Sequence, residues 1–209
     1  MADIIAALMD LYARQAYPEI QDPVEVVFEA ELPDYDLGVD QEVMRDHLKR
    51  FAEGTGLAES SRNLKAESDK EGKAKGYYQW LTEVPKTKEN PAGEGQPAFQ
   101  TALNRLSRYY EKGRKRIAPW ILKAKEHNDP TKLTKRQQDA LFYADVFQRK
   151  GTTTEFGEGY EQGKLQEIMR TGNPDIMNKV YLDDWHTKPP DMSQDSWQKV
   201  MDNARRSFY

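Results

Sequence analysis

The chain has 209 residues, of which 37% are hydrophobic and 32% are charged, and its formal net charge is −4. This length fits one domain, or one domain with an extension, and the 11% of aromatic residues excludes a disordered chain. The net negative charge argues against nucleic acid as the main partner, because phosphate binding needs a basic face. The chain has no cysteine, which excludes disulfides, thiolate zinc sites and cysteine nucleophiles.

The N-terminal part is predicted to be an extension, residues 1–38, that docks on the domain or on a partner. Apolar residues at helical spacing predict a helix over residues 3–16. Three prolines divide the segment that follows, and residues 24–32 between them alternate in part between apolar and polar. This pattern predicts a short strand or an extended arm. Residues 39–209 are predicted to form the domain.

The sequence predicts neither a signal peptide nor a transmembrane helix. Asp3 stands where a signal peptide has its basic region, and the first apolar run ends at Asp10. The chain contains no apolar run of the roughly 18 residues that a membrane span needs. We therefore expect no membrane span.

The domain shows helical patterns separated by glycine- and proline-rich loops. Asp40 and Thr134 are predicted N-caps, and a further helix is predicted to begin at Ala98. More helices are predicted over residues 164–171, 174–186 and 193–207. Because the only predicted strand lies in the extension, the fold class is predicted to be mainly α.

A dense motif lies between Glu59 and Gln79. Glu59 and Ser60 are followed at fixed intervals by Asn63, Ala66, Ser68, Gly72, Ala74, Gly76 and Gln79. This order resembles the signature of lytic transglycosylases and related lysozyme-like muramidases, and the string GYYQWL resembles phage versions of that fold. With the helical lead-in and the following loop, the resemblance extends over residues 37–87.

The motif departs from the family pattern in three places. The interval from Ser68 to Gly76 is two residues longer than usual, and Leu64 replaces the usual proline. Gly54 and Gly56 stand where the family has a continuous helix. We expect these two glycines to interrupt or kink the approach to Glu59.

The resemblance implies a lysozyme-like helical domain that cleaves the MurNAc-GlcNAc bond of peptidoglycan, with Glu59 as its single general acid and base. Protonation of the leaving oxygen at neutral pH requires a carboxyl in apolar surroundings, which Tyr77, Tyr78 and Trp80 can supply. The N-acetyl group of the substrate then attacks, and its 6-hydroxyl closes a 1,6-anhydro sugar. If water attacked instead, the second carboxylate would be Glu67, Asp69 or Glu71.

The resemblance also implies a set of substrate-binding residues, namely Asn63, Ser68, Gly76, Tyr77, Tyr78 and Gln79. It implies no metal and no cofactor. The family often places a tyrosine from a later helix near the glutamate, and the candidates here are Tyr109, Tyr110 and Tyr143. Glu53 is a rival acid, but the motif does not follow it.

Lack of an export signal, together with the resemblance to phage versions, predicts a protein of the phage virion, carried on the tail or ejected. It would act on peptidoglycan glycan strands in the host periplasm and cell wall and help genome entry. Residues 1–38 would attach it to other virion or tail proteins. The sequence leaves the oligomeric state open, including a homo-oligomer in the virion.

Two other classes of function are weighed against this one. The first is a non-catalytic helical virion or tail adaptor with a lysozyme-like fold. The second is a DNA-binding protein that uses the basic run over residues 105–116, whose two tyrosines could stack on bases. Residues 181–191 hold three aspartates and a histidine, but no HExxH motif, and are predicted to be a helix end and a proline-rich turn.

Overall fold

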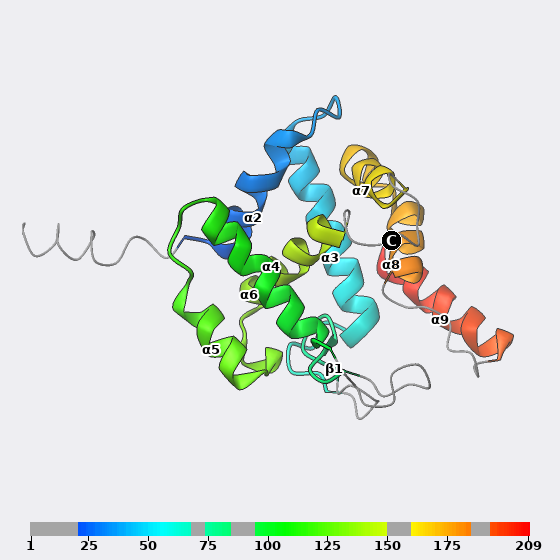
Figure 1. Cartoon of the computed structure of the whole chain (residues 1–209). Helices are drawn as coiled ribbons and strands as arrows, with labels where there is room; N and C mark the ends of the chain where they lie inside the picture. Colours follow the sequence, from blue (N-terminus) through cyan, green and yellow to red (C-terminus); the bar gives the residue numbers. More distant parts are fainter. Residues whose placement is uncertain (1–20, 68–73, 85–94, 150–159, 185–192) are drawn as a thin grey trace, which may run out of the picture.

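Helices make up most of the structure, a computed structural model that describes residues 21–67, 74–84, 95–149, 160–184 and 193–209. Its elements in chain order are α2 (Pro23–Glu31), η1 (Leu32–Asp34), α3 (Gln41–Ser60), β1 (Ala74–Lys75), β2 (Trp80–Leu81), α4 (Ala98–Lys112), α5 (Pro119–His127), η2 (Pro130–Lys132), α6 (Lys135–Arg149), α7 (Tyr160–Thr171), α8 (Pro174–Asp184) and α9 (Gln194–Ser207) (Figure 1). The predicted mainly α class is confirmed. Within the described residues, no helix combines the length and the apolar character needed to cross a membrane.

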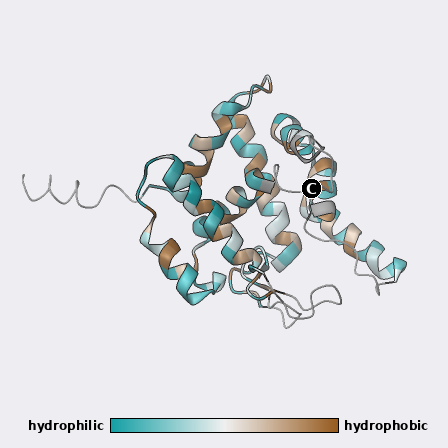
Figure 2. Cartoon of the chain, in the orientation of Figure 1, coloured by the Kyte–Doolittle hydropathy of each residue, from teal (hydrophilic) through white to brown (hydrophobic). Residues whose placement is uncertain are grey.

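Helix α6 lies at the centre of the core. It packs against α2, α3 and α4, and most of its residues between 138 and 147 are buried. The Phe142 ring lies 4.6 Å from the Tyr78 ring and 5.6 Å from the Phe51 ring, measured between centroids. A helix that is apolar on most sides needs neighbours on most sides. In Figure 2 the hydrophobic residues accordingly lie mainly on the inner sides of the helices.

Residues 24–32 are helical, so the predicted strand or extended arm is wrong for this part of the N-terminal extension. Asp22 is the N-cap of α2 and accepts a hydrogen bond from the Val24 amide at 2.9 Å, while Pro23 occupies the first turn. The side chains of Val24, Val26, Val27 and Phe28 are buried in the common core. From residue 22 onward the extension is therefore a packed part of the core, and residues 1–20 lie outside the described part.

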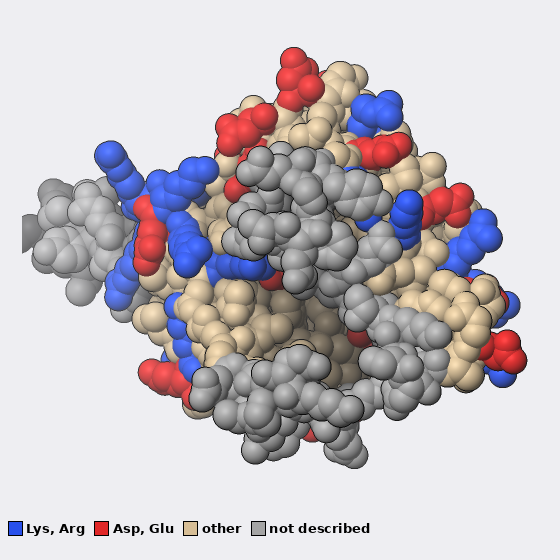
Figure 3. Space-filling view, turned by 45° about the vertical axis from the view of Figure 1, so that its right-hand side comes forward, with Lys and Arg blue, Asp and Glu red and all other residues tan. Residues whose placement is uncertain are grey.

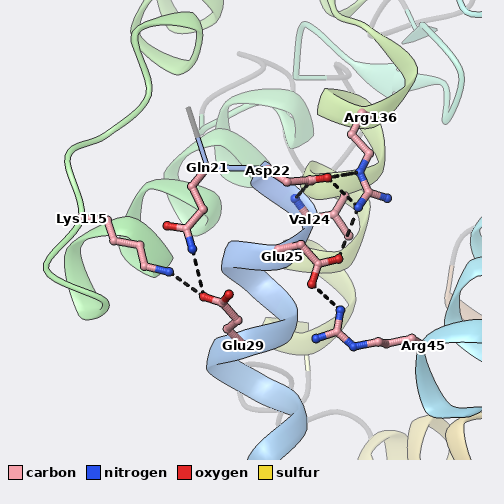
Figure 4. A network of polar contacts seen from close by, with 8 residues as sticks. All are labelled: Gln21, Asp22, Val24, Glu25, Glu29, Arg45, Lys115 and Arg136. Atoms are coloured by element: carbon pink, nitrogen blue, oxygen red, sulfur yellow. Dashed lines mark hydrogen bonds and ion pairs between the residues drawn. The ribbon is translucent and has the colours of Figure 1, made fainter. Parts of the chain in front are cut away.

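Charged side chains tie α2 to three other parts of the chain (Figure 4). Arg136 of α6 donates to both carboxylate oxygens of Asp22 at 2.9 Å and lies 3.4 Å from Glu25. Arg45 of α3 forms an ion pair with Glu25 from the other side. Lys115, which follows α4, lies 2.8 Å from Glu29. These pairs connect α2 to α6, α3 and the end of α4.

Helix α3 runs without interruption from Gln41 to Ser60, so the expected break at Gly54 and Gly56 is wrong. A β-carbon on Gly54 would overlap the Phe208 ring, and one on Gly56 would overlap the Tyr77 ring. Both glycines therefore allow an aromatic ring to pack closely against the helix. They do not end it.

The predicted helix starts are confirmed at three positions. Helix α3 begins after Asp40 and helix α4 at Ala98. Thr134 and Gln137 form a reciprocal capping box before α6, because the Thr134 amide donates to Gln137 at 2.9 Å and the Gln137 amide donates to Thr134 at 3.3 Å. The strands are misplaced in the prediction, since β1 and β2 pair antiparallel within the motif segment.

Candidate functional site

Glu59 stands in the last turn of α3 and is partly exposed. The helix ends in a left-handed residue, Ser61, with φ 53°. The amides of Ser61 and Arg62 then donate to the carbonyls of Leu57 and Gly56 at 3.0 and 3.3 Å. This cap stops the helix directly after Glu59 and leaves its carboxylate at the end of a 20-residue rigid element.

A tyrosine from helix α8 holds the Glu59 carboxylate. The Tyr181 hydroxyl donates to Oε1 of Glu59 at 2.9 Å, and the Tyr181 side chain is 2% exposed. Burial, with the Glu59 charge beside it, raises the pKa of Tyr181, so the hydroxyl keeps its proton and remains a donor. The two residues are 122 positions apart in the chain.

Tyr181 was not among the tyrosines that the sequence suggested for this position. Tyr109 donates to Glu31 at 2.8 Å, and Tyr143 packs against the Phe28 ring, with centroids 4.7 Å apart. The available signal was weak: Tyr181 follows Met177 and Val180 at helical spacing, which places it on the buried face of α8 but does not say what it faces.

The rest of the motif forms a small hairpin. Gly76 and Gln79 begin and end the turn between β1 and β2 with φ 80° and 47°, a left-handed conformation that favours glycine. The Gly76 amide donates to Ala66 at 2.7 Å, and the Gln79 side chain donates to Gly76 at 3.0 Å. The backbone of Glu67 forms an isolated antiparallel β-bridge with Lys75 of β1. The structure thus brings the end of the motif close to the chain that leaves α3.

Tyr77 and Tyr78, which the sequence predicts to bind substrate, are buried and support this hairpin from inside. Each is 3% exposed. The Tyr77 amide donates to Gln138 of α6 at 2.7 Å, and the Tyr77 ring covers Gly56. The Tyr78 hydroxyl donates to Asp139 at 2.6 Å, and burial, together with the Asp139 charge, raises the pKa of Tyr78 well above its usual value. Both side chains fix the hairpin to α3 and α6.

The remaining predicted residues are exposed or lie outside the described chain. Asn63 is exposed and accepts from the Lys65 amide at 3.0 Å, which closes the turn after α3. Ser68 lies outside the described residues, as do Asp69 and Glu71. Glu67 is exposed and forms a 3.3 Å ion pair with Lys75.

The arrangement is suited to proton exchange with a bound ligand. A carboxylate that is partly exposed, fixed on a rigid helix and oriented by a buried donor has the geometry of a general acid or base. The described residues contain no group of three or more acidic or histidine side chains that could hold a metal ion.

A separate shallow pocket is lined by Asp36, Gly38, Val39, Asp40 and Val43. It lies at the start of α3, and Glu59 lies at its end, about 27 Å away along the helix at 1.5 Å per residue. The two are therefore separate features of the surface.

A scan against protein-family models, a search of curated proteins and a search of solved structures each gave no match. The mainly α class comes from the structure itself. The lysozyme-like fold is an expectation from the motif between Glu59 and Gln79.

Proposed function

We propose that this protein cleaves the MurNAc-GlcNAc bond of peptidoglycan as a lytic transglycosylase, with Glu59 as general acid and base. The observation that supports this most is the pair of Glu59 and Tyr181. The motif indicates Glu59 as the acid from local sequence alone, and in the fold this carboxylate accepts a hydrogen bond from a buried hydroxyl at 2.9 Å.

In the proposed reaction Glu59 first gives its proton to the glycosidic oxygen. The carboxylate left behind accepts the hydrogen bond from Tyr181, which stabilises its charge. The N-acetyl group of the substrate attacks the anomeric carbon as the bond breaks. Glu59 then takes the proton of the 6-hydroxyl, whose oxygen displaces the N-acetyl group and closes the 1,6-anhydro ring.

The hairpin supports this proposal through its position and its rigidity. The Tyr77 ring packs on Gly56 of the helix that bears Glu59, and Tyr78 is hydrogen-bonded to Asp139 of α6. Positioning of this kind is a large part of enzymatic rate enhancement. We assign substrate contact to Asn63, which is exposed, and Gln79, which is partly exposed, together with Ser68. Gly76 is buried, and its role is to shape the turn of the hairpin.

The proposed setting is the phage virion, with action on the host cell wall during genome entry. It rests on the resemblance to phage versions of the motif. Because α2 packs into the core, the proposed attachment to tail proteins falls to residues 1–20.

A non-catalytic virion or tail adaptor is the second candidate. One observation favours it: the side chains of Tyr77, Tyr78 and Gln79 are all engaged in contacts within the protein. An adaptor would keep the fold of this segment without turnover.

Mass spectrometry of the products from purified peptidoglycan separates the candidates. We expect the wild type to release muropeptides that end in anhydro-muramic acid, and Glu59→Gln to lower the rate by about 10²–10⁴-fold with an unchanged fold. Glu53→Gln, an exposed glutamate on the same helix, is the matched control and should retain activity. Reducing-end products would indicate hydrolysis and a water-activating carboxylate such as Glu67. No products from the wild type would favour the adaptor.

A further inference from the structure

The end of α4 and the segment after it present a group of exposed cations. Arg108, Lys112, Arg114 and Arg116 are exposed, and none of the four forms an ion pair with another described residue. We call these four residues the basic end. Figure 3 shows Lys and Arg side chains gathered on the flank where α4 ends.

The charge of this segment contrasts with the charge of the whole chain. Residues 105–116 hold six Lys and Arg and one Glu, which gives +5, so the other residues sum to −9 in a chain of net charge −4. Two of the six cations are paired within the fold, Arg105 with Asp145 and Lys115 with Glu29. The Debye length is about 10 Å at 0.1 M salt, so negative charges further away on the protein are largely screened from a ligand at this surface. Such a ligand is attracted mainly by the four unpaired cations.

The arrangement is not the one that stability alone would favour. Arg108 and Lys112 are like charges four positions apart on one helix, which repel each other. Arg114 has φ 53°, the left-handed conformation that favours glycine, while the neighbouring Gly113 has φ −77°. The helix dipole explains a lysine in the last turn, but it does not explain Arg114 and Arg116, which lie beyond the helix. Strain of this kind is concentrated at functional sites.

We infer that the basic end binds the phosphate backbone of duplex DNA without reading its bases. Guanidinium groups match phosphate geometry, and three of the four residues are arginines. Tyr109 and Tyr110, the aromatic residues of the same run, are each 3% exposed and cannot stack on bases. Binding therefore depends on the attraction between these cations and the phosphate groups of the DNA backbone. A duplex carries phosphates at higher density than a single strand and is therefore favoured.

The basic end is also distant from Glu59 and its hairpin. Asn128 donates to Thr82 beyond β2 at 2.7 Å and accepts from Gln100 at 2.9 Å, so the hairpin lies at the start of α4. The basic end begins at Arg108, about 15 Å along this helix from Ala98 at 1.5 Å per residue, and continues past the far end of the helix. The inference therefore does not depend on the activity proposed for Glu59, and the two can be tested separately.

The test is fluorescence anisotropy with a labelled random-sequence DNA duplex of about 30 base pairs, titrated between about 50 and 200 mM salt. The test variant is the triple Lys112→Gln, Arg114→Gln, Arg116→Gln. The matched control is the triple Arg170→Gln, Lys179→Gln, Arg206→Gln, which removes the same three charges from exposed positions elsewhere.

We expect the wild type to bind, with affinity that falls steeply as salt rises. The test triple should reduce the slope of log K against log salt by about 2 to 3, at roughly 0.9 per phosphate contact, and the control should leave it unchanged. Arg114→Gly should weaken binding while it raises the melting temperature, because it relieves the left-handed strain. A misfolded variant cannot produce that combination.

Three outcomes would overturn the inference. They are no binding by the wild type at low salt, equal loss of slope in both triples, and binding of poly(glycerol phosphate) with no binding of the duplex. The last would assign the basic end to a phosphate polymer of the cell wall.

Discussion

The two ends of helix α3 are held in different ways. Near its start, Arg45 pairs with α2, while His47 and Arg50 donate to backbone carbonyls of Met169 and Gly172, at the end of α7. Near its end, α3 packs closely on other elements through its glycines, and the Tyr181 hydroxyl of α8 donates to Glu59. The start of α3 is held by charged side chains, and we call it the charge-held end. The other end is held by close packing at its glycines, and we call it the shape-held end.

This difference suits the proposed role of α3, in which Glu59 at its end is the reactive group. One ion pair and two hydrogen bonds in the first half of α3 anchor the helix without occupying the carboxylate at its end. Packing at the glycines holds Tyr77, and with it the hairpin, in place while Glu59 stays partly exposed. Each of the following predictions tests one side of this comparison.

The largest effect is expected from Gly56→Ala. The added β-carbon would overlap the Tyr77 ring, and we expect a loss of about 1–3 kcal/mol in the free energy of unfolding, measured by urea denaturation. Peptidoglycan cleavage should fall as well, because the hairpin must shift.

Gly163→Ala is the matched control for this substitution. Gly163 is an exposed glycine in α7, and a β-carbon there meets no other atom within 4 Å. This change should stabilise the protein by about 0.5–1 kcal/mol through helix propensity. If both variants had the same stability, close packing at Gly56 would not be the reason for that glycine.

A smaller effect, confined to stability, is expected from Arg45→Ala. This change removes the ion pair with Glu25 and the stacking of the guanidinium 5.1 Å from the Phe28 ring centroid. We expect a loss of about 1–2 kcal/mol, since the Arg45 side chain is 19% exposed. Activity per folded molecule should not change. A lower kcat for folded Arg45→Ala would contradict the separation of the two ends.

The helices of the domain could be predicted from sequence because their signals are local. Thr134 and Gln137 form a capping box that the sequence displays, and Ala98 begins a segment with regular apolar spacing. Helix α2 was missed for a local reason too. Its valines have high strand propensity, and burial on several sides removes the alternation that marks a surface helix, although Asp22 and Pro23 are an N-cap and first-turn pair.

The candidate site was less predictable because its partners are distant in the chain. The motif identified Glu59, but its contact with Tyr181 joins residues 122 positions apart. The glycines at 54 and 56 indicate helix breaks by propensity, and only the positions of Phe208 and Tyr77 explain them. One sequence shows residue types and spacing, and it does not show which side chains meet across the core.

A modest effect is expected from Tyr181→Phe, which tests the shape-held end directly. The change removes the hydroxyl donor to Glu59 and keeps the buried ring, so stability should fall by about 0.5–1.5 kcal/mol. Kinetics on soluble glycan fragments should show a lower kcat with little change in KM, because Tyr181 orients the acid and does not bind the sugar. A rise in KM alone would instead place Tyr181 in substrate binding.

The smallest effect is expected from pH acting on the ion pair between Asp22 and Arg136, which ties α2, the partner of Arg45, to α6. Burial opposes ionisation of Asp22, but the Arg136 side chain and the Val24 amide outweigh it and lower the pKa of Asp22 below its usual value. A carboxyl with a lowered folded-state pKa stabilises the protein above its unfolded pKa of about 3.9, and this contribution is lost as the pH falls through the folded value. Urea denaturation between about pH 5 and pH 2 should therefore show falling stability. Arg136→Gln should make that fall shallower, by no more than about 1 kcal/mol, because both side chains are about two-fifths exposed. Identical pH profiles for the wild type and Arg136→Gln would show that this ion pair does not contribute to the anchoring of α2.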